Sequence, residues 1–153
     1  MIGESMRLRT TLGGFLLAVG TLLALIPATT ASAAPGAGIA ATPTCVQVRY
    51  FYQGADVPAV SRTGSVNCNM VRGNVSPAVE QLQLSLNRCS PDSLRRAGVY
   101  PLSLDGNFGG NTEKGLRYAQ ADHGTGADGV YGPATRKAIS HFDSNGEGCL
   151  RVT

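Results

Sequence analysis

The sequence predicts a mainly α, small three-helix domain preceded by a short disulfide-stapled β ribbon. The phrase D-G-x-[FY]-G-x-x-T occurs twice, as "DGNFGGNT" at 105–112 and as "DGVYGPAT" at 128–135. Apolar residues follow helical spacing from residue 76 onward, whereas they alternate in the segment before it. Four cysteines are spread over both parts of the chain. These features predict a β/loop extension at 45–75 and a helical domain at 76–153.

The first 34 residues have the pattern of an export signal. Two arginines precede about 15 mostly apolar residues at 12–26, a run shorter than a membrane-spanning helix needs. An A-x-A cleavage pattern follows at 31–33. We therefore expect residues 1–34 to be removed and residues 35–44 to form a flexible N-terminus, although an uncleaved anchor helix is the alternative. The expected protein is secreted, extracellular or cell-wall associated, with no membrane segment after cleavage.

Composition and charge restrict the class of partner. The chain has 13 Lys+Arg and 10 Asp+Glu, a net charge of +3 that is scattered along the sequence. Binding to nucleic acid is not expected, because it requires a clustered basic face. The length suits one domain, and the absence of Trp indicates a modest core. We expect a monomer without a cofactor.

The extension is predicted to form a ribbon of two strands. Residues 45–53 place Val46, Val48, Tyr50 and Tyr52 on alternate positions, which is the period of a strand with one buried face. Residues 65–70 are the second strand candidate. A lone hairpin is marginally stable in water, so a disulfide within this segment would stabilise it.

The cysteines are predicted to form two disulfides, since an even number in a small exported chain favours a disulfide framework. We favour Cys45 with Cys68, which share one short segment, and Cys89 with Cys149, which bracket the helical part. The sequence alone leaves the other two pairings open. A zinc site is the rival interpretation, but no C-x-x-C spacing supports it, and we expect no metal.

Three helices are predicted after residue 75. Ser76 is an N-cap candidate and Pro77 suits a first helical position, which begins a helix of about 13 residues. The two copies of the phrase open the second and third helices. Their core-facing positions correspond at an offset of 23 residues: Thr112, Gly115, Leu116 and Ala119 in one, and Thr135, Ala138, Ile139 and Phe142 in the other. Residues 90–104 are expected to be a loop with one helical turn.

The residues that recur in the phrase all have structural interpretations. The Asp-Gly pairs form tight turns, the aromatic residues fill the core, the next glycines admit the chain into a helix, and the threonines satisfy free N–H groups of the first helical turn. Pro133 fits a first helical position. These motif residues are Asp105, Gly106, Phe108, Gly109 and Thr112 in the first copy, and Asp128, Gly129, Gly132, Pro133 and Thr135 in the second.

The order and spacing of these motifs resemble the peptidoglycan-binding domain of bacterial cell-wall proteins, in a stand-alone secreted form. The resemblance rests on V-x-x-L-Q-x-x-L-N at 79–87, on the two phrases, and on a glutamine late in the second helix, and it covers roughly residues 75–142. One departure is Ala119, where the family usually has an aromatic residue. The resemblance implies a three-helix fold and non-catalytic binding of peptidoglycan.

Such a ligand would need amide groups, a charged group and aromatic faces in a shallow groove. The candidates for ligand contact are Asn107, Arg117, Tyr118, Gln120 and Tyr131. Each also has a structural interpretation: Arg117 as a solvated helix face, Gln120 as a helix-end hydrogen bond and Tyr131 as a core residue. A separate wall hydrolase is a further candidate partner.

Two other classes of function are weighed against binding. A wall hydrolase would need paired carboxylates or a metal set, and His123 and His141 match no metal-ligand motif, so we expect no enzyme. A secreted inhibitor or effector on a disulfide-stabilised scaffold is the main alternative, with residues 52–65 as its exposed loop.

Overall fold

The computed structural model describes residues 41–146 and 148–153. The expected export signal and most of the expected flexible N-terminus lie outside these ranges. The elements in chain order are β1 (Gln47–Tyr52), β2 (Ala55–Ala59), α1 (Pro77–Cys89), α2 (Pro91–Ala97), α3 (Gly110–Asp122), α4 (Pro133–Ala138), β3 (His141–Asp143) and β4 (Gly148–Leu150). The described part thus contains four helices and two β hairpins. Within it, no helix is long and apolar enough to cross a membrane.

The β ribbon is built from different strands than the sequence predicts. β1 pairs with β2 in antiparallel register, whereas residues 65–70 contribute only isolated bridges to other segments. The predicted alternation also fails, because Val48 is buried but Val46 and Tyr50 are 43% and 51% exposed. An irregularity between Arg49 and Tyr52 interrupts the register, and Phe51 there has a φ of 55°. Such a bulge re-aims side chains and breaks the period of two.

All five residues of β2 are buried. The strand contacts α1 and β3, so it is enclosed on more than one side. This placement corrects the interpretation of residues 52–65 as one exposed loop, because residues 55–59 are buried and the exposed positions are limited to Gln53, the bend at 61–63 and Ser65. Pro58 is tolerated in β2 because the sheet has two strands and each has a free edge.

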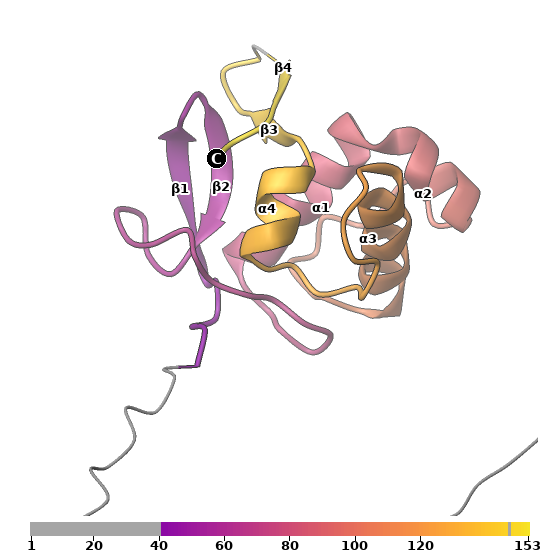
Figure 1. The fold of residues 1–153 in the computed structure, drawn as a ribbon, viewed down its shortest axis with the longest axis horizontal. Helices are drawn as coiled ribbons and strands as arrows, with labels where there is room; N and C mark the ends of the chain where they lie inside the picture. The colour runs from indigo at the N-terminus through magenta and orange to yellow at the C-terminus, as the bar shows by residue number, and fades with distance from the viewer. Residues whose placement is uncertain (1–40, 147) are drawn as a thin grey trace, which may run out of the picture. The chain divides into compact units, whose positions relative to one another are not determined.

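The first helix begins where the sequence predicts. The Ser76 hydroxyl accepts a hydrogen bond from the Val79 N–H at 3.3 Å, and Pro77 occupies the first turn. Val79, Leu82 and Leu86 are fully or almost fully buried on one face. In Figure 1, β1 and β2 lie on one side of α1, and α2 and α3 lie on the other. α1 is therefore the central element of the fold.

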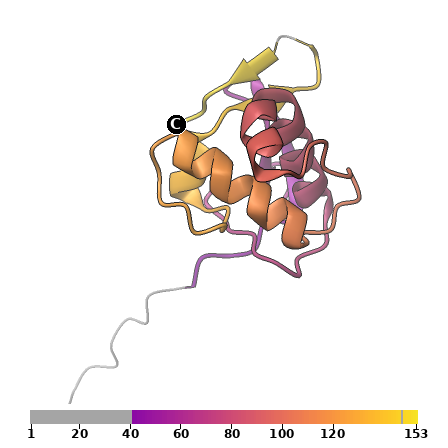
Figure 2. The same cartoon turned by 90° about the vertical axis from the view of Figure 1, so that its right-hand side faces the viewer.

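A fourth helix, α2, occupies part of the segment that was expected to be a loop. Pro91 lies in its first turn, and Gly98 ends it in the left-handed conformation with a φ of 67°. α2 packs against α3, which faces the viewer in Figure 2. Gly115 of α3 makes this approach possible, because a Cβ there would lie 2.5 Å from a methyl carbon of Leu94.

The last helix is shorter than its apolar spacing predicts. α4 ends at Ala138, and Ile139 is extended with a ψ of 160°. Phe142, expected on the helical stripe, lies instead in β3, which pairs with β4. The Cys89–Cys149 disulfide joins β4 to the end of α1. We attribute the early end of the helix to this hairpin, which needs extended backbone directly after α4.

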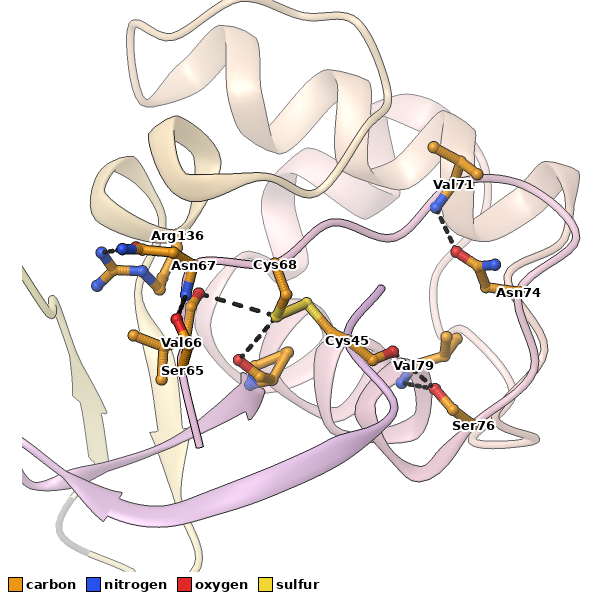
Figure 3. The surroundings of a disulfide bond; sticks show 11 residues. Cys45, Ser65, Val66, Asn67, Cys68, Val71, Asn74, Ser76, Val79 and Arg136 are labelled. Atoms are coloured by element: carbon orange, nitrogen blue, oxygen red, sulfur yellow. Dashed lines mark hydrogen bonds between the residues drawn. A yellow bond between two sulfur atoms is a disulfide. The ribbon is translucent and has the colours of Figure 1, made fainter. Parts of the chain in front are cut away.

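The second disulfide links Cys45 to Cys68, and both residues are fully buried. These two pairs are the ones that the cysteine positions favour. Figure 3 shows Cys45 beside the start of α1, where the Ser76 hydroxyl donates to the Cys45 carbonyl at 3.4 Å. The disulfide therefore fastens the extension to the N-cap of the central helix.

Candidate functional site

A buried glutamine of α1 holds the first copy of the phrase, residues 105–112, called the first turn below. The Gln83 amide donates to the Asp105 carboxylate at 2.8 Å, to the Asn107 carbonyl at 3.0 Å and to the Thr112 hydroxyl at 3.2 Å. Its carbonyl accepts from the Gly106 N–H at 3.0 Å. Gln83 is 1% exposed, so these bonds lie out of water and satisfy polar groups that burial would otherwise penalise.

A glutamine of α3 holds the second copy, residues 128–135, called the second turn. The Gln120 amide donates to the Asp128 carboxylate at 2.8 Å, to the Val130 carbonyl at 3.0 Å and to the Thr135 hydroxyl at 2.9 Å. The Gly129 N–H donates to the Gln120 carbonyl at 2.8 Å. The same four bonds thus occur in both turns. We call each set a glutamine clasp.

One segment, residues 68–76, which includes a turn at 72–73, connects the first and second turns. Met70 and Tyr131 exchange two backbone hydrogen bonds, of 2.8 and 3.0 Å, at the second turn. Farther along, the Phe108 N–H of the first turn donates to the Asn74 carbonyl at 2.8 Å. Phe108 and Tyr131 occupy corresponding positions, and both are fully buried. The segment begins at Cys68, so the buried disulfide anchors it (Figure 3).

A pocket of about 260 Å³ opens beside the first turn. Polar groups dominate its walls, and the Asp105 carboxyl is its acidic member. Hydrogen bonds from Gln83 and from the Asn107 N–H hold the pKa of Asp105 below its usual range, so this side chain is anionic at neutral pH. The lining residues are Gln83, Leu102, Ser103, Asp105, Asn107, Gly109, Gly110, Asn111 and Thr112.

The Arg72 guanidinium lies at the edge of this first-turn pocket. A nitrogen of Arg72 would be 3.5 Å from a Cβ on Gly110, and the same side chain forms a loose ion pair of 3.9 Å with Glu113. A hydrogen-bonded carboxylate and an exposed guanidinium therefore flank the glycines that begin α3. A ligand with an amine and a carboxylate would find a partner for each.

The second turn exposes different chemistry at the corresponding positions. Val130 replaces Asn107, and Ala134 replaces Asn111. Pro133 replaces Gly110 and removes a backbone N–H. The second turn therefore keeps the clasp but lacks the amide side chains of the first.

The five candidates for ligand contact do not converge on one site. Asn107 is exposed and lines the first-turn pocket. Arg117 lies over the second turn, where it donates to Glu113 at 3.0 Å and to the Ala127 carbonyl at 3.1 Å. Tyr118 is 40% exposed and is not among the residues that line the first-turn pocket. Gln120 and Tyr131 are fully buried, so neither side chain is presented at the surface. Gln120 forms the clasp and Tyr131 fills the core.

Sequence reasoning missed Ser103 and Asn111 as pocket residues and Arg72 as their neighbour, and it assigned Asp105 only a structural role. A signal for two of the polar positions was present in the sequence. When the two phrases are aligned, Asn107 and Asn111 face Val130 and Ala134, and this difference in polarity marks the first turn. Arg72 lies outside the repeat and had no comparable signal.

The two histidines have structural surroundings. Burial lowers the pKa of His141 to about 4, so the ring is neutral, and its Nε2 lies 3.1 Å from the Arg136 carbonyl. The His123 Nδ1 lies 3.1 Å from the Arg151 guanidinium. In residues 41–146 and 148–153, no group of three or more His, Cys, Asp or Glu residues is placed to hold a metal ion.

Residues 75–139 match the family described as "putative peptidoglycan binding domain". This segment contains both turns and both clasps, and the match supports cell-wall binding. No curated protein and no solved structure matches the chain significantly.

Proposed function

We propose that the protein is secreted and binds peptidoglycan without catalysing a reaction, and that the first-turn pocket is the contact. The observation that carries the binding function is the family match over residues 75–139. Secretion is supported by the signal-like residues 1–34 and by the two disulfides, which are typical of oxidising compartments.

The chemistry of the first-turn pocket suits the peptide stem of peptidoglycan. The Asp105 carboxylate would pair with a free amine of the stem, and Arg72 would pair with a free carboxylate. Asn107 and Asn111 would exchange hydrogen bonds with peptide amides, because their side chains are exposed and have no hydrogen-bond partner among the described residues. Since the protein binds without cleaving, a separate wall hydrolase is a candidate partner.

The test replaces the polar positions of the first turn with those of the second. The variant Asn107→Val with Asn111→Ala should reduce retention on purified, protein-free peptidoglycan sacculi by about tenfold, because two hydrogen-bonding side chains are lost. The matched control changes the corresponding second-turn positions, Val130→Ala with Ala134→Ser, and should be retained like the wild type. Thermal unfolding checks that both variants fold.

Three outcomes decide the proposal. If the wild type is not retained on sacculi at low salt, peptidoglycan binding is wrong. If the first-turn variant is retained as well as the control, the site lies elsewhere. If the wild type lowers the turbidity of the sacculus suspension, the protein is an enzyme and the non-catalytic function is wrong.

A further inference from the structure

A second pocket, of about 420 Å³, lies between the end of α1, the start of α2 and the segment that follows α2. Its walls include Leu84, Arg88, Arg95, Tyr100 and Leu104. The segment 100–104 separates it from the first-turn pocket, since Leu102 and Ser103 line that one. We call this second site the arginine pocket.

The arginine pocket has two cations and no carboxylate among its lining residues. The Arg88 guanidinium stacks over the Phe142 ring at 5.6 Å from its centre and has no ion-pair partner among the described residues. Arg95 lies over the Tyr100 ring at 4.5 Å and pairs with Asp92 at 2.7 Å. The Asp92 side chain is 85% exposed, and an ion pair of this kind is weak enough to yield to a ligand.

Aromatic and apolar surface lies beside these cations. Tyr100 remains 43% exposed although Arg95 covers part of its ring, and Leu104 is 47% exposed. At Leu84 and Leu104 the pocket meets a smaller hollow that Glu80 and Tyr50 line, so the carboxylate of Glu80 marks the end of the cationic surface. An apolar ring face next to two guanidinium groups favours a ligand that combines a ring with an anion.

We propose that the arginine pocket binds an acidic glycan, whose sugar ring packs on Tyr100 while its carboxylate or phosphate groups pair with Arg88 and Arg95. Both guanidinium groups can form two parallel hydrogen bonds to such an oxyanion. This site is distinct from the first-turn pocket, which carries a carboxylate and suits an amine. The inference goes beyond the proposed function and does not depend on the first-turn pocket.

The experiment measures binding of the purified protein to three soluble glycans by isothermal titration calorimetry. The first is glycan strands from which an amidase has removed the peptides, so that each muramoyl residue carries a free carboxylate. The second is a sugar–phosphate polymer, and the third is an uncharged chitin oligosaccharide. We expect at least one acidic glycan to bind about tenfold more tightly than chitin. The acidic glycan that binds identifies the source of the anion.

Substitutions test whether Arg88, Arg95 and Tyr100 contact the glycan. Arg88→Gln with Arg95→Gln should weaken binding of the acidic glycan about tenfold and reduce its salt dependence, and Tyr100→Ala should also weaken it. Arg62→Gln is the matched control, because Arg62 is exposed, has no partner among the described residues and lies outside the pocket. The first-turn variant should bind the acidic glycan like the wild type, which separates this test from the sacculus assay. Equal binding of chitin, no binding of either acidic glycan, or an unchanged affinity in the double arginine variant would overturn the proposal.

Discussion

The first and second turns share their interior and differ at their surface. In each turn a buried glutamine forms four hydrogen bonds to the same positions of the phrase, and an aromatic residue fills the core beside it. Outside the clasp, the first turn presents Asn107 and Asn111, and the second presents Val130 and Ala134. The residues that recur in both copies of the phrase therefore stabilise the turns, whereas the residues that differ between the copies are available for binding.

The two turns also differ in the helices that hold them in place. The first turn is held by α1, an element distant in sequence, since Gln83 lies 22 residues before Asp105. The second is held by the helix directly before it, since Gln120 lies 8 residues before Asp128. Arg117, one turn earlier on that helix, adds a bond to the Ala127 carbonyl. The glutamine of the first clasp is therefore distant in sequence and that of the second is local, although Met70 also pairs with the second turn across a long stretch of chain.

The largest expected effect comes from removing either clasp. Gln83→Ala and Gln120→Ala should each lower the free energy of unfolding by about 3 kcal/mol, because a buried glycine N–H and a partly buried carbonyl lose their partner in each case. Denaturant unfolding at equilibrium measures both. Gln47→Ala, at a half-buried glutamine without a side-chain partner among the described residues, is the control and should change stability by less than about 0.5 kcal/mol. Losses below about 1 kcal/mol in either clasp variant would show that the bonds are not structural.

The clasps show where prediction from the sequence stops. The start of α1 at Ser76 and Pro77 follows from local capping chemistry, and the core positions of α3 follow from its apolar spacing. The partners of Gln83 do not follow, because a glutamine on a helix gives no sign of which distant turn it contacts. β2 was missed for a similar reason. Its Asp and Pro are typical of loops, and it becomes a buried strand through pairing with β1 and contacts with α1 and β3.

The candidate site likewise contains residues that could be predicted from the sequence and residues that could not. Asn107 could be named from the sequence because it stands in the repeated phrase. The burial of Tyr131 and Gln120 could not be predicted, since a tyrosine beside a turn and a glutamine late in a helix suit a surface as well as a core. Tyr131 pairs with Met70 of the segment 68–76, and Gln120 bonds to the second turn, and neither contact can be predicted from the local sequence.

The glycines of the two turns should differ in their tolerance of alanine. Gly106 and Gly129 have φ values of 66° and 73°, where alanine is strained by about 1 kcal/mol. A Cβ on Gly106 would also lie 3.0 Å from the Ser76 carbonyl oxygen, which belongs to the backbone at the N-cap of α1. A Cβ on Gly129 would meet side-chain atoms of Glu113 and Arg117, which can move.

Gly106→Ala should therefore cost about 2 kcal/mol and Gly129→Ala about 1 kcal/mol in the free energy of unfolding. Thermal and denaturant unfolding of the two variants, measured side by side, give the order. The reverse order would mean that the contact with the N-cap of α1 is not the tighter one. It would also contradict the view that the first turn depends more on long-range packing.

The smallest expected effect is a gain in stability, from making the second turn resemble the first. Tyr131 corresponds to Phe108, and its buried hydroxyl has no hydrogen-bond partner in the described part of the chain. Burial also raises the pKa of this phenol, so it stays protonated and brings a donor into the core. Tyr131→Phe removes that group without changing the ring, and it should raise the free energy of unfolding by about 1 kcal/mol. Phe108→Tyr, the reverse exchange, is the control and should lower it. A loss of stability in Tyr131→Phe would instead show that the hydroxyl is hydrogen-bonded in solution, and that the two aromatic residues are not equivalent.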